Sequence, residues 1–562
     1  MWLMNIKNID KEKKDLLLLT LFILIVSCGC LIYPEIPFGH DGRFHLSRIS
    51  SLRDAILLGY DFPVKIYPNY FNGIGYGNGL FYPDLFLYIP AYISTLGINV
   101  ITSYKITLVL CSIFTILFMY KCSKAITNSH YAAYISTLIY TLSGYRLCNM
   151  YDRGAIGELL AMCFIPLSFY GFYHIMWRDK NKCLFFIIGF TGLLMSHIIS
   201  SVLYIIFLVI LFIIQTPYLF KNIYRLKPLL FSLFLILLLV SYFYIPMIEQ
   251  LYLDKFILNT QTITNDLAAS TVQLYKLFLD FPLHFIPKLN LGGISGIGIL
   301  ALISIFLYSK NIKSYKKDNI VIFKLFGVAI VITIFICNFF PWNTVLKIIP
   351  WFSAIQFPWR FYVISVFLFS IIGGYIYNSY FTSKTIYKYL FVAYALIGFI
   401  NIAPPYLITI HLQNKGIPVL FDRYFVGNAE YIPAETTKKE LWNNDLRVKS
   451  NNKTIKIESH FVGDKYIIHY TDNNIDSTFI ELPLLYYKGY VAIEDDKHKI
   501  SISKSKKGLI NINLNPEKEE GIIYVLYEGT KIQKIFNWVS ICTFCGLIIY
   551  LYIFTYREKK NY

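Results

Sequence analysis

Ten residues near the start of the chain, Gly39 to Arg48, combine side chains that could move a proton and bind phosphate. Asp41 stands just before a helical pattern and is predicted to be its N-cap. His45 and Arg48 follow at positions that share one helix face with Asp41. A carboxylate can accept a hydroxyl proton, and a guanidinium can hold a phosphate. An amphipathic helix lying on a membrane surface has the same pattern, so that alternative stays open.

A second acidic group is predicted around residues 146–158. It contains Asp152, Arg153 and Glu158, with glycines at 154 and 157 that would let another segment approach the backbone closely. Glu158 lies among apolar residues, where a carboxylate is costly unless it faces a cavity or a partner. Asp152 has a plainer alternative, because it could simply cap the helix that comes after it.

Three more residues at the ends of apolar segments could bind a substrate. They are His197, Trp359 and Arg360. His197 could instead be a helix-end residue bonded to backbone, and Arg360 beside Trp359 could be an interfacial anchor. Acids and cations, with Arg43 among the latter, are all expected on one membrane face. That combination suits a phosphate-linked lipid substrate.

The elements that must position these residues are membrane helices. The chain has 562 residues, of which 56% are hydrophobic and 18% aromatic, and long apolar runs indicate a polytopic membrane protein. The net charge of +18 comes largely from short basic loops, and no basic-aromatic module indicates nucleic acid as a partner. The cysteines lie in or beside apolar segments, which argues against a disulfide framework.

Apolar runs predict about twelve transmembrane helices. They are expected near 16–33, 103–121, 130–147, 154–177, 183–197, 199–214, 228–247, 291–309, 319–338, 358–379, 388–408 and 536–555. Residues 83–98 are also apolar but short and contain two prolines, so we expect an interfacial or re-entrant segment there. With that choice the basic loops all fall inside, and both termini are cytoplasmic. The first helix is expected to stay uncleaved, although a basic start before an apolar run also resembles a signal peptide.

This topology gives a mainly α-helical membrane protein with an extracytoplasmic β-rich C-terminal domain. Residues 1–411 form the transmembrane domain, with a first outer loop at 34–102. Residues 412–535 show the alternation of strands, as at 454–458 and 500–503, and are expected outside. Residues 536–562 form a last transmembrane helix and a cytoplasmic tail.

Several stretches resemble one family of bacterial membrane proteins. They are Gly39–Ile49, Tyr151–Glu158, Ser196-His197, Phe357–Phe361, Gly427–Pro433 and Leu482–Tyr490. In this order they resemble the YfhO-like proteins, also called 6-pyruvoyl-tetrahydropterin synthase-related, of the GT-C glycosyltransferase superfamily. The resemblance spans nearly the whole chain. Nothing in it resembles a soluble pterin synthase, so the pterin label is treated as a naming artefact.

The resemblance implies transfer of a sugar from a polyprenyl-phosphate donor to a cell-surface polymer, on the outer face of the membrane. Asp41 is then the candidate base and also a candidate metal ligand, and Glu158 and Asp152 fill the second acidic position. The candidate substrate-binding residues are His45, Arg48, Arg153, His197, Trp359 and Arg360. A divalent cation such as Mg or Mn is an open expectation, because His40-Asp41 stands in place of an acidic pair. A non-enzymatic carrier or an assembly factor for lipid-linked sugars remains the alternative.

Overall fold

The computed structural model describes residues 11–37, 39, 41–179, 182–260, 267–278, 296–380, 384–414, 425–427, 429–437, 441, 447–471, 478–495, 498–514 and 518–560. Its contacts divide the chain into two units. The first comprises Met1–His45, Tyr104–Ile236 and Ile263–Leu420, and the second comprises Leu46–Ser103, Leu237–Thr262 and Phe421–Tyr562. These segments differ from the predicted boundaries at 411/412 and 535/536, which stay a prediction. His40 lies outside the described residues.

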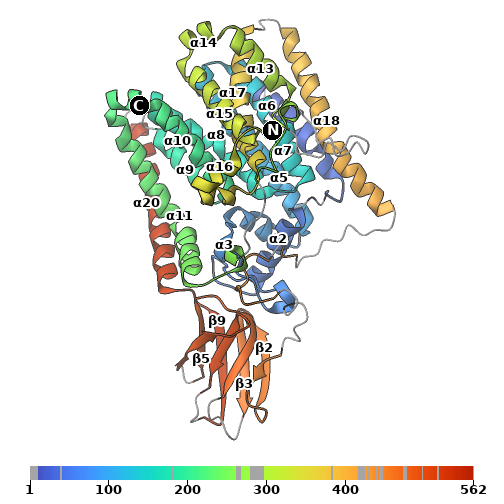
Figure 1. Ribbon diagram of the computed structural model, residues 1–562, viewed down its shortest axis with the longest axis vertical. Coiled ribbons are helices and arrows are strands. Elements are labelled where there is room, and N and C mark those ends of the chain that lie inside the picture. The colour runs from blue at the N-terminus through green and yellow to red at the C-terminus, as the bar shows by residue number, and fades with distance from the viewer. Residues whose placement is uncertain are drawn as a thin grey trace. The chain divides into compact units, whose positions relative to one another are not determined.

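The first unit is a bundle of helices. Its elements are α1 (Lys11–Cys28), α5 (Val100–Thr127), α6 (His130–Thr141), α7 (Gly144–Leu147), α8 (Ile156–Trp177), α9 (Cys183–Leu194), α10 (Ile198–Lys221), α13 (Ile299–Lys310), α14 (Ile312–Asp318), α15 (Ile320–Ile336), α16 (Trp342–Ile348), α17 (Tyr362–Tyr380) and α18 (Lys384–Asn414) (Figure 1). Helices α8 and α17 are buried along most of their length, so they form its core. Glycine allows the tight packing of α8 on α9, since a Cβ on Gly189 would lie 2.2 Å from the nitrogen of Ser168.

Eight helices in the described residues are long and apolar enough to cross a membrane. They lie at Lys11–Ile32, Val100–Thr127, Ile156–Trp177, Ile198–Lys221, Ile223–Leu253, Pro358–Tyr380, Tyr389–His411 and Lys531–Ile553. The chain is therefore a mainly helical, multi-pass membrane protein, as predicted. The count of twelve spans is not confirmed, because the predicted spans at 130–147, 183–197, 291–309 and 319–338 contain helices of 12 to 17 residues.

The segment expected not to cross contains only a short helix. Helix α4 (Tyr88–Thr95) has eight residues, preceded by the 3-10 turn Leu85–Leu87. A helix of that length extends about 12 Å, against a hydrocarbon core of about 30 Å. Its length is consistent with the interfacial or re-entrant segment that the prolines favour.

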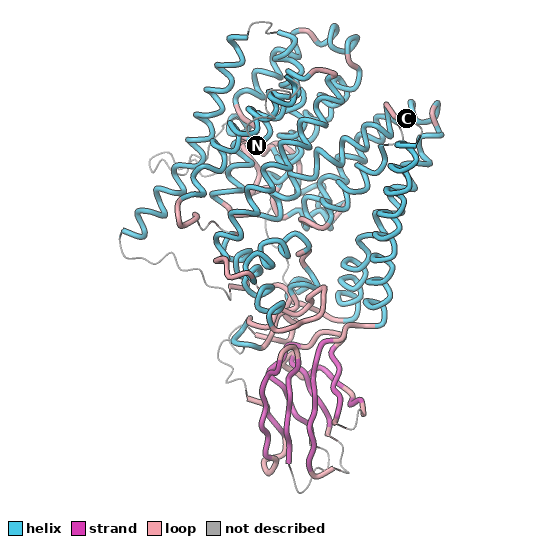
Figure 2. Tube along the Cα trace, turned by 180° about the vertical axis from the view of Figure 1, so that it is seen from behind, coloured by secondary structure: helices cyan, strands magenta, loops and turns pink. Residues whose placement is uncertain are grey.

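The second unit contains the predicted β-rich region. Two antiparallel sheets have the strand orders β1-β4-β8-β7 and β2-β3-β9-β5-β6 among the described residues. The strands are β1 (Lys449–Ser450), β2 (Lys456–Val462), β3 (Lys465–Thr471), β4 (Phe479–Leu485), β5 (Tyr490–Glu494), β6 (Lys499–Ile500), β7 (Ile502–Lys504), β8 (Leu509–Asn513) and β9 (Glu520–Tyr527). Figure 2 shows the strands gathered in one block. Residues from both sheets, such as Ile468 of β3 and Ile510 of β8, share one apolar core.

Helices and a buried loop complete the second unit. They include most of α2 (Gly42–Leu57), α3 (Asn78–Phe81), the end of α11 (Leu226–Leu253) and α20 (Lys531–Lys560). Helix α20 lies beside α11, where the hydroxyls of Ser241 and Ser540 are 3.0 Å apart. The glycine run at 73–79 belongs to this loop, and residues 74–79 are buried. A Cβ on Gly77 would lie 2.7 Å from the ring of Tyr487, so glycine is required for this packing.

Candidate active site

The first unit brings Asp41 against the turn that carries Arg153. The amide of Asp41 donates to the carbonyl of Arg153 at 2.8 Å, and the carbonyl of Asp41 accepts from His45 at 3.1 Å as α2 begins. The turn needs glycine at position 154, which has φ +67° and where a Cβ would lie 2.7 Å from the Cα of Gly42. Two glycines thus allow two distant segments to touch through their backbones.

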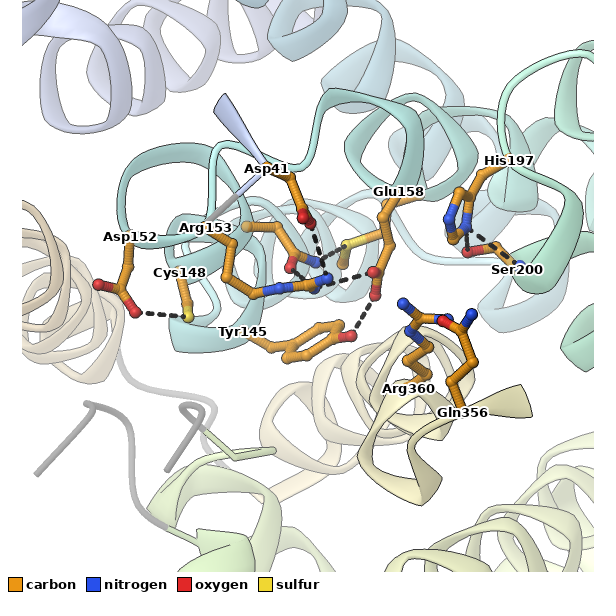
Figure 3. Close-up of polar contacts among 12 residues, drawn as sticks. Asp41, Tyr145, Cys148, Asp152, Arg153, Glu158, His197, Ser200, Gln356 and Arg360 are labelled. Atoms are coloured by element: carbon orange, nitrogen blue, oxygen red, sulfur yellow. Dashed lines mark hydrogen bonds and ion pairs between the residues drawn. The ribbon is translucent and has the colours of Figure 1, made fainter. Parts of the chain in front are cut away.

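Arg153 lies between two carboxylates. One guanidinium nitrogen is 2.8 Å from Glu158 and the other is 3.4 Å from Asp41. Figure 3 shows both carboxylates directed at this guanidinium. The Glu158 side chain is 1% exposed, whereas that of Asp41 is 43% exposed. Glu158 is therefore an internal counter-ion, and Asp41 keeps access to a ligand.

Neutral groups fix this ion pair in place. The hydroxyl of Tyr145 donates to the second oxygen of Glu158, and the amide oxygen of Asn149 accepts from Arg153. The ring of Trp359 lies 4.7 Å from the guanidinium carbon of Arg153, a distance typical of a cation–π contact. Burial by itself would lower the pKa of Arg153, but the neighbouring carboxylates of Glu158 and Asp41 raise it above its usual value. Arg153 is therefore held as a permanent cation.

Arg360 is a second buried cation near this group. It belongs to the 3-10 turn Pro358–Phe361 and donates to the side chain of Gln356 at 2.8 Å and to the carbonyl of Ile355 at 3.4 Å. Both acceptors are neutral. Among the described residues, its Nε is buried without a hydrogen-bond partner. Arg360 interacts electrostatically with Glu158, and Figure 3 shows its guanidinium beside that carboxylate. The site thus contains a cation whose hydrogen bonds leave room for an anionic ligand.

His197 lies at the edge of the group. It is the N-cap of α10, and its Nδ1 accepts from the amide of Ser200 at 3.2 Å. His197 is therefore a helix-end residue bonded to backbone, which was one of the two alternatives from the sequence. His197 also interacts electrostatically with Glu158, so its ring is near the site as well.

The other predicted site residues lie elsewhere. Asp152 accepts from the thiol of Cys148 at 3.6 Å and points away from Arg153 (Figure 3). His45 is buried with its ring 5.4 Å from that of Phe44, and Arg43 is exposed. A catalytic role for Asp152 and a substrate-binding role for His45 stay predictions.

Arg48 belongs to the second unit. Its guanidinium donates to the carbonyls of Pro83 at 2.8 Å and Tyr82 at 3.4 Å, and it lies 4.2 Å from the ring of Tyr82. These contacts give Arg48 a structural role in holding α2 against the loop that comes after it. Its predicted role in substrate binding stays a prediction.

A divalent cation would need ligands that the described residues of the site do not supply. No three His, Cys, Asp or Glu side chains in the described part of the chain converge as a metal site would require. Asp41 and Glu158 are bridged by Arg153, so a guanidinium stands between the two carboxylates that could have shared an ion. The described residues therefore do not fit a metal site, and the proposed reaction has no step through a metal.

Sequence reasoning missed the neutral partners of the site. Asn149 lies one helical turn before Arg153, and Gln356 lies four residues before Arg360. This spacing from the two predicted arginines could have identified both amides as hydrogen-bond partners. Tyr145 stands next to Arg146, but the guanidinium of Arg146 does not join the site. Arg146 donates to the hydroxyl of Ser112 at 3.0 Å.

Fold and site together define a multi-pass membrane protein with a buried carboxylate–arginine group at the ends of its core helices. No family model matches the chain, so the YfhO-like assignment is not supported by comparison. A protein of Lactococcus lactis subsp. cremoris (strain MG1363), described as uncharacterized, is 22% identical over 624 residues, covering 99% of this chain and 98% of the relative.

Three solved structures from Archaeoglobus fulgidus show a partial likeness. An oligosaccharyltransferase in the apo form gives a TM-score of 0.40 at 11% identity, covering 71% of this chain and 55% of that enzyme. The enzyme AglB with an inhibitory peptide and a dolichol-phosphate gives 0.38 at 11% identity, with 72% and 56% covered. The oligosaccharyltransferase tethered to an acceptor peptide gives 0.40 at 11% identity, with 74% and 55% covered. The chain thus spans a little over half the length of these enzymes, and a likeness of this size does not establish an activity.

Proposed function

We propose that this chain is a membrane glycosyltransferase of the GT-C type. It would move a sugar from a polyprenyl-phosphate donor in the membrane to a cell-surface polymer. The observation that carries the proposal is a half-exposed carboxylate, Asp41, beside two buried arginines, of which Arg360 makes hydrogen bonds only to neutral groups among the described residues. The sequence resemblance described above supports the same class.

In the proposed reaction Asp41 accepts the proton of an acceptor hydroxyl. The oxygen of that hydroxyl attacks the anomeric carbon of the donor sugar, a new glycosidic bond forms, and the bond from that carbon to the phosphate oxygen breaks. The products are a glycosylated polymer and a polyprenyl phosphate. The contact with Arg153 orients Asp41, and the exposed part of the carboxylate would face the acceptor.

Arg360 is the proposed binding group for the departing phosphate. A guanidinium offers several N–H donors, and charge-assisted bonds to phosphate oxygens are stronger than neutral ones. Arg153 is already neutralised by Glu158, whereas Arg360 has no carboxylate within salt-bridge distance among the described residues. Negative charge that develops on the phosphate in the transition state would be stabilised by this second arginine. Trp359 and His197 would then border the donor.

The proposed orientation in the membrane rests on charge. Basic residues gather in the loops predicted to be cytoplasmic, which supports an orientation with the Asp41 group on the outer face and both termini inside. Membrane lipid surrounds the apolar helices, and the partners are the lipid-linked donor and the polymer. Nucleic acid is not among them.

The test is the cell envelope of a deletion strain. Mass spectrometry should show the loss of one sugar substituent, which the intact gene restores and an Asp41→Asn gene at equal protein level does not. Restoration by Asp41→Asn would reject the enzyme and favour the carrier or the assembly factor, because neither of these needs a base.

A further inference from the structure

A cavity of about 260 Å³ lies wholly within the second unit, apart from the site described above. Three parts of that unit line it: residues 60–75 after α2, residues of the strands β2, β3, β4, β5 and β9 with their adjoining turns, and the first turns of α20. Pockets for small ligands begin at about 300 Å³, so this cavity suits a ligand of one or two rings.

The cavity has polar groups that the fold leaves without partners. Asn537 of α20 lines it, and its side-chain oxygen is buried without a hydrogen-bond partner in the described part of the chain. An unsatisfied buried carbonyl costs about 1–3 kcal/mol, which a ligand donor would recover. Tyr60 and Asp464 line the same cavity. Burial and the charge of Asp464 together raise the pKa of Tyr60. Tyr60 and Asp464 offer a donor and an acceptor to the same space.

Aromatic rings line the remaining wall. The rings of Tyr490 and Tyr527 are 5.3 Å apart in an edge arrangement, and Tyr466 lies in the same lining. The hydroxyl of Tyr527 contacts the side chain of Gln533 at 3.0 Å, which fixes both at the base of α20. Flat apolar faces beside amide and carboxylate groups match a pyranose ring, which has an apolar face and a rim of hydroxyls.

The charged residues of the lining favour a neutral ligand over an anionic one. Among the described lining residues there are three acids, Asp61, Asp464 and Glu528, and two lysines, Lys65 and Lys534. Lys534 is paired with Glu528 at 3.0 Å. The ammonium of Lys65 lies 5.5 Å from the ring of Tyr242, a residue that does not line the cavity. The remaining charge is negative, which repels phosphate groups.

We infer that this cavity binds an uncharged sugar unit through Asn537, Asp464 and the tyrosine wall. It is a binding site without covalent chemistry. That the bound sugar belongs to the acceptor polymer rests on the proposed function. In that case the second unit holds the polymer through a neutral sugar residue, away from any phosphate in it.

The test is saturation-transfer NMR on the full chain in lipid nanodiscs, with methyl β-glucopyranoside, methyl N-acetyl-β-glucosaminide and glucose 6-phosphate as probes. We expect millimolar binding of at least one neutral glycoside and at least tenfold weaker binding of the sugar phosphate. Asn537→Leu should weaken the neutral probe tenfold, and Asp464→Asn several-fold. Asn511→Leu is the matched control, because its side-chain oxygen is also buried without a partner but lies outside the cavity lining.

Thermal unfolding of each variant establishes that it is folded. The inference is overturned if no neutral glycoside binds, if glucose 6-phosphate binds more tightly, or if folded Asn537→Leu and Asp464→Asn bind as the intact chain does. Equal weakening by Asn511→Leu also overturns it. Asp41→Asn should bind the sugar normally. Sugar binding without any transfer by the intact chain would therefore reject the proposed function and leave this site in place.

Discussion

Glu158→Gln tests whether the buried ion pair holds the site together. The substitution keeps the size of the side chain and removes its charge 2.8 Å from Arg153, where both side chains are less than one tenth exposed. Removing one member of a buried pair costs about 3–5 kcal/mol. The amide oxygen can still accept from Arg153, and Asp41 remains 3.4 Å from the same guanidinium. We therefore expect a loss of about 2–4 kcal/mol in the free energy of unfolding.

The assay is denaturant unfolding of the detergent-solubilised chain, followed by tryptophan fluorescence, to which Trp359 beside Arg153 contributes. Glu12→Gln is the matched control. Its partner Lys124 lies at 2.6 Å, but both side chains are about 40% exposed. Exposed pairs contribute about 0–1 kcal/mol, so this control should lose little. The reasoning is refuted if Glu158→Gln loses no more stability than Glu12→Gln.

Three further changes test the site and the second unit. Gly154→Ala should cost about 2–4 kcal/mol in thermal or denaturant unfolding, because alanine is strained at φ +67° and its Cβ would lie 2.7 Å from Gly42; unchanged stability would contradict this. Arg360→Gln should raise the KM for the lipid-linked donor about 10- to 100-fold and leave the acceptor KM unchanged in steady-state kinetics, whereas equal effects on both would argue against phosphate binding. Burial lowers the pKa of Lys65 and the charge of Asp84 raises it, with a net fall from 10.5 to about 8. Between these two pH values the folded chain binds fewer protons than the unfolded chain, so the free energy of unfolding rises with pH there. Lys65→Met should flatten that rise in thermal unfolding from pH 7.5 to 10, and an unchanged slope would show that Lys65 is not the cause.

Much of the architecture could be predicted from hydropathy and alternation. Long apolar runs predict membrane helices because backbone groups in lipid must be bonded within the helix. Alternation at 454–458 and 500–503 predicted strands, and the structure has β2 from Lys456 onward and the short strands β6 and β7 on either side of residue 501. The number of spans could not be settled, because segments such as 183–197 are apolar but form helices of only 12 residues.

The site was predictable in part. Asp41, Arg153 and Glu158 could be singled out because charges at the ends of apolar segments need partners. The ion pairs that these residues form could not be predicted, because they depend on the contact of Gly154 with Gly42, which no local sequence pattern encodes. Arg48 shows the limit most clearly. Its helical spacing from Asp41 was correct, yet its guanidinium is bonded to the carbonyls of Pro83 and Tyr82.

The central claim is that Asp41 acts as the base in sugar transfer. The direct measurement is donor turnover by the purified chain in proteoliposomes, with a polyprenyl-phosphate sugar and the surface polymer, comparing the intact chain, Asp41→Asn and Glu12→Gln. A positioned base contributes about 10²- to 10⁴-fold, so Asp41→Asn should lose at least a hundredfold in kcat while Glu12→Gln retains its rate. Turnover by Asp41→Asn within a few-fold of the intact chain would contradict the account.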